Sequence, residues 1–185
     1  FFSLKGEIEE LLTHCGLNGR FRYDGNCEKP YYHPGRKANI FYEGKVLGTM
    51  GEIHPDVLKN FDLKERAYVA VLDLEEVYPL AGDHKKYTPV AKFPAVSHDF
   101  SLLVPLNVTA GEVEDAIREA ASPLLEKVEL FDIYEGAQVL AGFKSLSYNV
   151  SLRAKDHTLS EEEINKVRGD LLTALEKIEV KLRDM

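Results

Sequence analysis

LEKVELFDIYEGAQVLAGFKSLSYNV, residues 125–150, is the stretch that decides how the second half of the chain folds. It predicts two strands joined by a loop: the outgoing strand ends in residues 131–136, and the returning strand begins at Phe143. The returning strand alternates strictly, which is typical of a half-buried antiparallel strand with one polar face. Its apolar members are Leu146, Tyr148, Val150 and Leu152, and its polar members are Ser145, Ser147, Asn149, Ser151 and Arg153. We therefore expect an open sheet face that can serve as a recognition surface.

The elements around this hairpin complete a β-α-β-β-α-β order over residues 92–185. The other predicted elements are a strand over 99–105, a helix over 109–121, a helix over 160–178 and a short strand over 179–183. Each helix begins with a capping box, Thr109-x-x-Glu112 and Ser160-x-x-Glu163. This order is ferredoxin-like, and right-handed crossovers place both helices on one face of a four-stranded antiparallel sheet. The prediction is an α+β domain whose second sheet face is open.

Residues 1–80 predict a separate, partial antiparallel-sheet module. Its expected elements are a helix over 3–15, strands over 20–23, 37–42, 45–53 and 66–74, and a helical turn over 56–60. Residues 27–36 are dense in turn residues and predict a loop, whereas the continuous apolar run in the last strand predicts burial on both faces. Cys15 falls on the apolar side of the first helix, so we expect it to be buried. Residues 81–91 show no periodicity and predict a linker.

Composition and charge limit the classes of partner. The 185 residues are 44% hydrophobic and 29% charged, with no apolar run near the roughly 20 residues that a membrane span needs. Two cysteines make no disulfide framework, so we expect a cytoplasmic protein. Residues 92–185 carry 11 basic and 17 acidic groups, a balance of −6 within a total of −8. A nucleic acid bound there must therefore be held locally, by stacking and a few placed groups.

The sequence contains no pattern that predicts a catalytic or metal centre. None of the six histidines stands at a metal-ligand spacing from another histidine or a cysteine. No GxSxG nucleophile elbow, P-loop or GxGxxG fingerprint occurs.

Asp132, Tyr134 and Ser145 form the candidate site. Asp132 and Tyr134 have i, i+2 spacing and project to the same side of a strand, and Ser145 begins the partner strand. A planar ring flanked by an acceptor and a hydroxyl suits an unstacked base, because the ring stacks while the polar groups bind the base edge. Spacing alone also allows the simpler interpretation that Tyr134 packs over the hairpin.

Several ordered motifs resemble the β subunit of bacterial phenylalanyl-tRNA synthetases. In the second half they are KFPAVSHDFSLLV (92–104), LFDIYEG (130–136), GFKSL (142–146) and TLSEEEI (158–164). In the first half they are FSLKG (2–6), HPGR (33–36) and GTMGEIHP (48–55). The resemblance spans essentially the whole chain. It implies the late part of a catalytic-like, class II synthetase-related module over residues 1–80 and a ferredoxin-fold anticodon-binding domain over residues 92–185.

The resemblance also implies a function and partners. Such enzymes are α2β2 heterotetramers that use ATP and magnesium to attach phenylalanine to its tRNA, with the chemistry on the α subunit. The chain is then expected to be a C-terminal fragment that is not catalytic by itself and holds no cofactor. The residues that match the family's base-contacting positions are Asp132, Tyr134 and Ser145. His98 stands where the family often carries Arg, so the role of that position is open here.

Two other classes of function stay open at this point. Ferredoxin-like domains also serve as small-molecule regulatory modules, which predicts a dimer with a ligand between sheets. The acidic second half also suits a purely structural assembly domain, which predicts no anticodon-dependent RNA binding.

Overall fold

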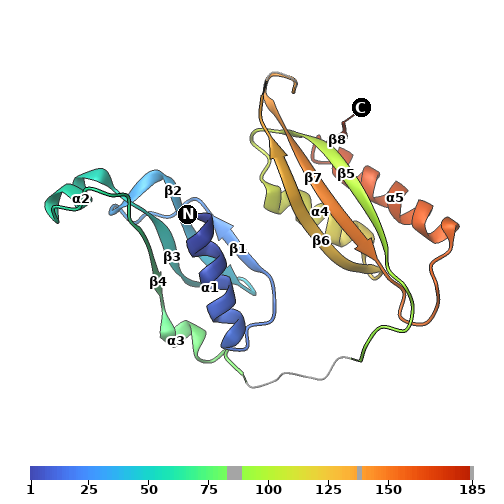
Figure 1. Cartoon of the computed structure of the whole chain (residues 1–185), viewed down its shortest axis with the longest axis horizontal. Helices are drawn as coiled ribbons and strands as arrows, with labels where there is room; N and C mark the ends of the chain where they lie inside the picture. Colours follow the sequence, from blue (N-terminus) through green and yellow to red (C-terminus); the bar gives the residue numbers. More distant parts are fainter. Residues whose placement is uncertain (83–88, 137–138, 184–185) are drawn as a thin grey trace. The chain divides into compact units, whose positions relative to one another are not determined.

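The chain folds into two units, which divide between Thr88 and Pro89 (Figure 1). Each unit contains one four-stranded antiparallel sheet. The computed structural model describes residues 1–82, 89–136 and 139–183. Most of the expected linker, residues 83–88, therefore lies outside the described residues. Each unit has its own cluster of buried hydrophobic residues.

The second unit has the predicted ferredoxin-like order. Its elements are β5 (Val96–Pro105), α4 (Ala110–Ala121), β6 (Leu125–Tyr134), β7 (Phe143–Leu152), α5 (Glu161–Glu176) and β8 (Lys181–Leu182). The sheet order is β6-β7-β5-β8, and α4 and α5 cover the same face (Figure 1). The α+β prediction is confirmed, although the last strand spans two residues instead of the five expected.

Local signals in the sequence explain where these helices begin. Thr109 and Ser160 are N-caps, and both predicted capping boxes form, with Glu112 and Glu163 completing them. The apolar stripes of the helices then pack on the alternating apolar residues of β7, all of which are buried. The deepest members of this core are Leu102, Val104, Val113, Ile117, Ala121, Leu146, Tyr148, Val150, Leu171, Leu175 and Val180. Because the apolar side chains go to the helices, the polar set of β7 lies on the other face.

A bulge at Phe131 determines to which face of the sheet the side chains at the end of β6 point. Leu130 pairs with Tyr148 on the helix side, and the next pair is Asp132 with Ser147, so Phe131 has no partner of its own. Strict alternation from Leu130 would turn Asp132 toward the helices. The extra residue instead turns Asp132 toward the polar face, which is how a bulge re-aims side chains.

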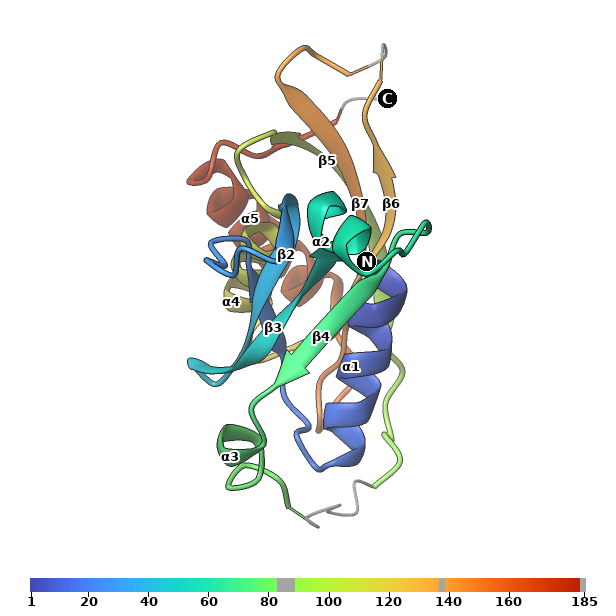
Figure 2. The ribbon, with the colours of Figure 1, turned by 90° about the vertical axis from the view of Figure 1, so that its left-hand side faces the viewer.

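The first unit is a helix-covered sheet of order β1-β2-β3-β4. Its elements are α1 (Phe2–His14), β1 (Phe21–Asp24), β2 (Tyr32–Tyr42), β3 (Lys45–Ile53), α2 (Pro55–Asn60), β4 (Tyr68–Leu72) and α3 (Leu74–Val77). The helix α1 lies along the sheet (Figure 2) and buries Ile8 and Leu12 against Ala38, Ile40 and Met50. Most predicted elements are present, within one to three residues of their expected ends.

Three expectations for this unit are wrong. Residues 32–36 belong to β2 and are not a loop, because a register shift between the Tyr32 and Lys37 pairs accommodates Pro34 without a ladder hydrogen bond. The strand β4 is an edge strand with Val69 and Val71 exposed, so its apolar run is not buried on both faces. Cys15 is exposed, because α1 ends at His14 and Cys15 is its C-cap, while Cys27 is the buried cysteine.

Candidate nucleic-acid interface

Tyr134 is the last residue of β6, and its side chain lies on the polar sheet face with 37% of its surface exposed. It stands directly across from Ser145, the third residue of β7. Asp132 stands across from Ser147 and is exposed, with no ion pair of its carboxylate among the described residues. The structure thus brings all three predicted site residues to one end of one sheet face.

Arg183 joins this group from the opposite edge of the sheet. Its backbone N–H donates to the Ser101 carbonyl at 2.9 Å, which continues the short β8 pairing. Its guanidinium Nη1 donates to the Ser145 hydroxyl at 3.3 Å, and its Cζ lies 6.0 Å from the centre of the Tyr134 ring. An arginine at this distance stabilises the ring by a cation–π interaction and keeps a positive charge beside it.

The sheet face was expected to be open, but at Ser145 it is covered, and the Arg183 side chain contacts Ser145 there. Ser145 is only 3% exposed, and Ser147 is also buried. Ser145 therefore meets the arginine in this structure, and its hydroxyl becomes available to another group only when the Arg183 side chain moves. Asp132 and Tyr134 are exposed as the structure stands.

Farther along the same face, short polar side chains bind one another across β5 and β7. The Ser97 and Ser151 hydroxyl oxygens are 2.6 Å apart, Asn149 Nδ2 donates to Asp99 at 2.7 Å, and the Ser101 and Ser147 hydroxyls are 3.4 Å apart. These cross-strand pairs keep the centre of the face flat and polar.

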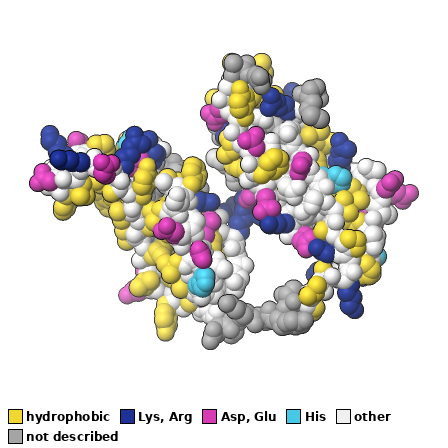
Figure 3. Space-filling model, in the orientation of Figure 1, with side chains coloured by type: hydrophobic (Ala, Val, Ile, Leu, Met, Phe, Trp, Pro, Cys, Tyr) yellow, Lys and Arg dark blue, Asp and Glu magenta, His cyan; other side chains and the backbone are white. Residues whose placement is uncertain are grey.

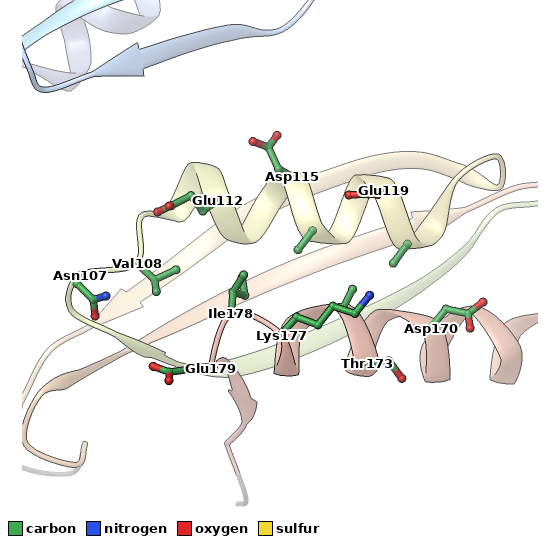
Figure 4. A pocket seen from close by; sticks show the side chains of 13 residues that line it. Asn107, Val108, Glu112, Asp115, Glu119, Asp170, Thr173, Lys177, Ile178 and Glu179 are labelled. Carbon is green, nitrogen blue, oxygen red and sulfur yellow. The ribbon is translucent and has the colours of Figure 1, made fainter.

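The opposite side of the domain is acidic. A groove of about 860 Å³ lies between α4 and α5, and several of the side chains that line it are carboxylates (Figure 4). The acidic members of its lining are Glu112, Asp115, Glu119, Asp170 and Glu179, and its basic member is Lys177. Acidic and basic side chains are otherwise interspersed on the face drawn in Figure 3. A polyanion is therefore repelled from the helix side, whereas the sheet side has Arg183 beside Tyr134 and Lys181 on the edge strand β8.

Sequence reasoning missed Arg183, although a signal for it was present. Val180 is buried in the core, so strand alternation places Lys181 and Arg183 on the polar face. The side-chain reach of Arg183 across two strands to Tyr134 was not readable from spacing.

Within residues 1–82, 89–136 and 139–183, no group of three or more His, Cys, Asp or Glu side chains is arranged to hold a metal ion. In the same part of the chain, none of the helices combines the length and the apolar character that crossing a bilayer requires.

Comparison with known proteins gives matches over both units. The ferredoxin-fold anticodon binding domain matches residues 91–183, and the phenylalanyl tRNA synthetase beta chain CLM domain matches residues 1–74. Three similar proteins carry the name phenylalanine–tRNA ligase beta subunit. The one from Symbiobacterium thermophilum is 41% identical over 99% of this chain and 20% of its own length. Those from Clostridium tetani and Clostridium acetobutylicum are 39% and 38% identical over 95% and 96% of this chain, and 22% of each relative is covered.

The chain spans about a fifth of the length of these curated relatives. Within that span the matches cover both units in the expected order, and the fold of the second unit agrees with the description of its family. The chain therefore belongs to the phenylalanyl-tRNA synthetase β-chain family, with its CLM-domain match in residues 1–74 and its ferredoxin-fold anticodon-binding domain in residues 91–183.

Proposed function

We propose that the second unit binds the anticodon of phenylalanine tRNA, as part of a ligase that uses ATP and magnesium to attach phenylalanine to that tRNA. The observation that carries this proposal is the exposed Tyr134 ring at the end of β6, with the Asp132 carboxylate on the same face and Arg183 beside the ring. The ring stacks on an everted base, Asp132 accepts hydrogen bonds from the base edge, and Arg183 offsets phosphate charge. Ser145 adds its hydroxyl when the arginine shifts toward the RNA.

The first unit serves assembly with the synthetase α subunit, in an α2β2 heterotetramer. Support comes from the face of its sheet that α1 leaves uncovered. Val46, Val69 and Val71 are exposed there on neighbouring strands, and an apolar sheet face of this kind is typical of a protein–protein interface. The catalytic steps, with their ATP and magnesium, belong to the α subunit in this proposal, and no residue of this chain is assigned to them.

The test is the affinity of the assembled synthetase for tRNA after Tyr134→Ala. Loss of one base stack weakens binding by about 1–3 kcal/mol, and Tyr134→Phe, which keeps the ring, retains most of the affinity. Both variants are measured by filter binding with phenylalanine tRNA and with an anticodon-substituted tRNA. The Tyr134→Ala loss is expected with the natural anticodon and is expected to shrink with the substituted one.

The same measurement separates the proposed function from a purely structural role. A purely structural domain predicts equal affinity for wild type and Tyr134→Ala with every tRNA. Such a result, obtained with a folded and assembled complex, would remove Tyr134 from the proposed interface.

A further inference from the structure

Gly136 lies directly against the hydroxyl end of the Tyr134 ring. A Cβ atom placed on Gly136 would be 2.6 Å from Tyr134 Oη, 2.8 Å from Cζ and 3.3 Å from Cε1. Real Cβ atoms essentially never approach another heavy atom to within 3.0 Å. All three nearest atoms belong to the same ring, so Gly136 leaves the space that this ring occupies.

The backbone of Gly136 does not itself require glycine. The glycines with positive φ in the described residues are Gly16, Gly44 and Gly142. Gly136 is outside that group, so its φ lies on the side that other residues also adopt. The physical reason for glycine at this position is then the Tyr134 side chain, which leaves no room for a Cβ atom.

We propose that Gly136 is a positioning residue for the nucleotide-binding ring. It lets the ring lie back against the start of the hairpin loop, at a place where the Arg183 guanidinium also contacts it. The ring thereby has a backbone stop at its hydroxyl end and a cation 6.0 Å from its centre, before any RNA arrives. This inference rests on the proposed function, because it assigns Gly136 a role in presenting the ring to a base.

The clash that alanine introduces would be relieved by the ring and not by the fold. The atoms that a Cβ would strike are at the far end of the Tyr134 side chain, which is partly exposed and turns about two torsions. Gly136→Ala is therefore expected to fold and assemble, with the ring displaced. Preorganisation is lost, since the displaced ring must be brought back before it can stack.

A double-mutant cycle in the assembled synthetase tests this inference. The dissociation constant for phenylalanine tRNA is measured for wild type, Gly136→Ala, Tyr134→Ala and the double variant. Gly136→Ala is expected to weaken binding about fivefold or more, approaching the effect of Tyr134→Ala. In the Tyr134→Ala background it is expected to change nothing, because the two residues act as one unit.

Two further variants sharpen the result. Gly169→Ala makes the same chemical change on α5, where an added Cβ meets nothing within 4 Å, and is expected to bind like wild type. Tyr134→Phe removes the atom nearest to the added Cβ, so Gly136→Ala is expected to cost less affinity in that background than with tyrosine.

The possible outcomes distinguish this inference from the proposed function. If Tyr134→Ala weakens binding while Gly136→Ala binds like wild type, the positioning role is overturned and the proposed function stands. If the two losses add in the double variant, Gly136 acts elsewhere and the inference is again overturned. If Tyr134→Ala itself has no effect, the proposed function fails and the inference falls with it.

Discussion

At the scale of single residues, the candidate site was predictable in its composition but not in its contacts. The i, i+2 spacing of Asp132 and Tyr134 correctly predicted a shared face, because Cβ direction alternates along a strand. The burial of Ser145 was not predictable, since it depends on Arg183, which is 38 residues away in the sequence. The bulge at Phe131 also left no clear mark in the apolar pattern. Local spacing therefore identifies which residue types gather, and long-range contacts decide which of them are exposed.

His157 gives a prediction at the same scale. Its ring hydrogen-bonds Asp156 at 2.8 Å and Glu163 at 2.9 Å, and these two carboxylates raise the pKa of His157 above its ordinary 6.5. A raised pKa contributes stability that is complete below the unfolded value and is lost as pH rises through the folded value. His157→Gln is therefore expected to lower the melting temperature at about pH 5.5 and to match wild type near pH 9.

Asp156 and Glu163 do not disturb this comparison. Their pKa values are lowered, that of Glu163 to about 2 by its bonds to Ser160 and His157, so both stay ionised throughout that range. A difference between wild type and His157→Gln that grew with pH would contradict the assignment.

At the scale of elements, helix starts were the most predictable feature because their signals are local. Both capping boxes formed as expected, whereas the edge position of β4 and the start of β2 at Tyr32 depend on sheet partners that spacing does not reveal. In α4 the Thr109 hydroxyl accepts from the Glu112 N–H at 3.2 Å, while the Glu112 carboxylate accepts from the Thr109 N–H at 2.7 Å. These bonds also lower the pKa of Glu112.

Removing this cap tests its contribution. Thr109→Ala is expected to lower the free energy of unfolding of the second unit by about 1 kcal/mol, measured by urea denaturation. Thr173→Ala is the matched control, because among the described residues its hydroxyl bonds only the Gly169 carbonyl within α5, and its effect is expected to stay within about 0.5 kcal/mol. Equal effects of the two substitutions would show that the capping box is not a local source of stability.

At the scale of the whole molecule, the net charge is −8, and we expect the affinity for RNA to depend only weakly on salt concentration. Lys181 and Arg183 lie on the polar face, while Lys127 and Arg153 on the same face are ion-paired with Glu129 and Glu126, so few counterions are expected to be released on binding. For this chain and an anticodon stem-loop, the slope of log K against log salt concentration is expected to lie between about −1 and −2. Arg183→Ala is expected to make the slope shallower by nearly one, while Tyr134→Ala lowers the affinity at every salt concentration. A slope steeper than about −5 would instead indicate a broad phosphate track.

The paired hydroxyls at the centre of the polar face have a consequence for what the domain can discriminate. Ser97 hydrogen-bonds Ser151, and Asn149 hydrogen-bonds Asp99, at 2.6 and 2.7 Å. Side chains that hydrogen-bond one another in this way are less available to a base than the exposed Asp132 and Tyr134. In the proposed complex we therefore expect base-specific contacts to be made mainly at the tip of the hairpin.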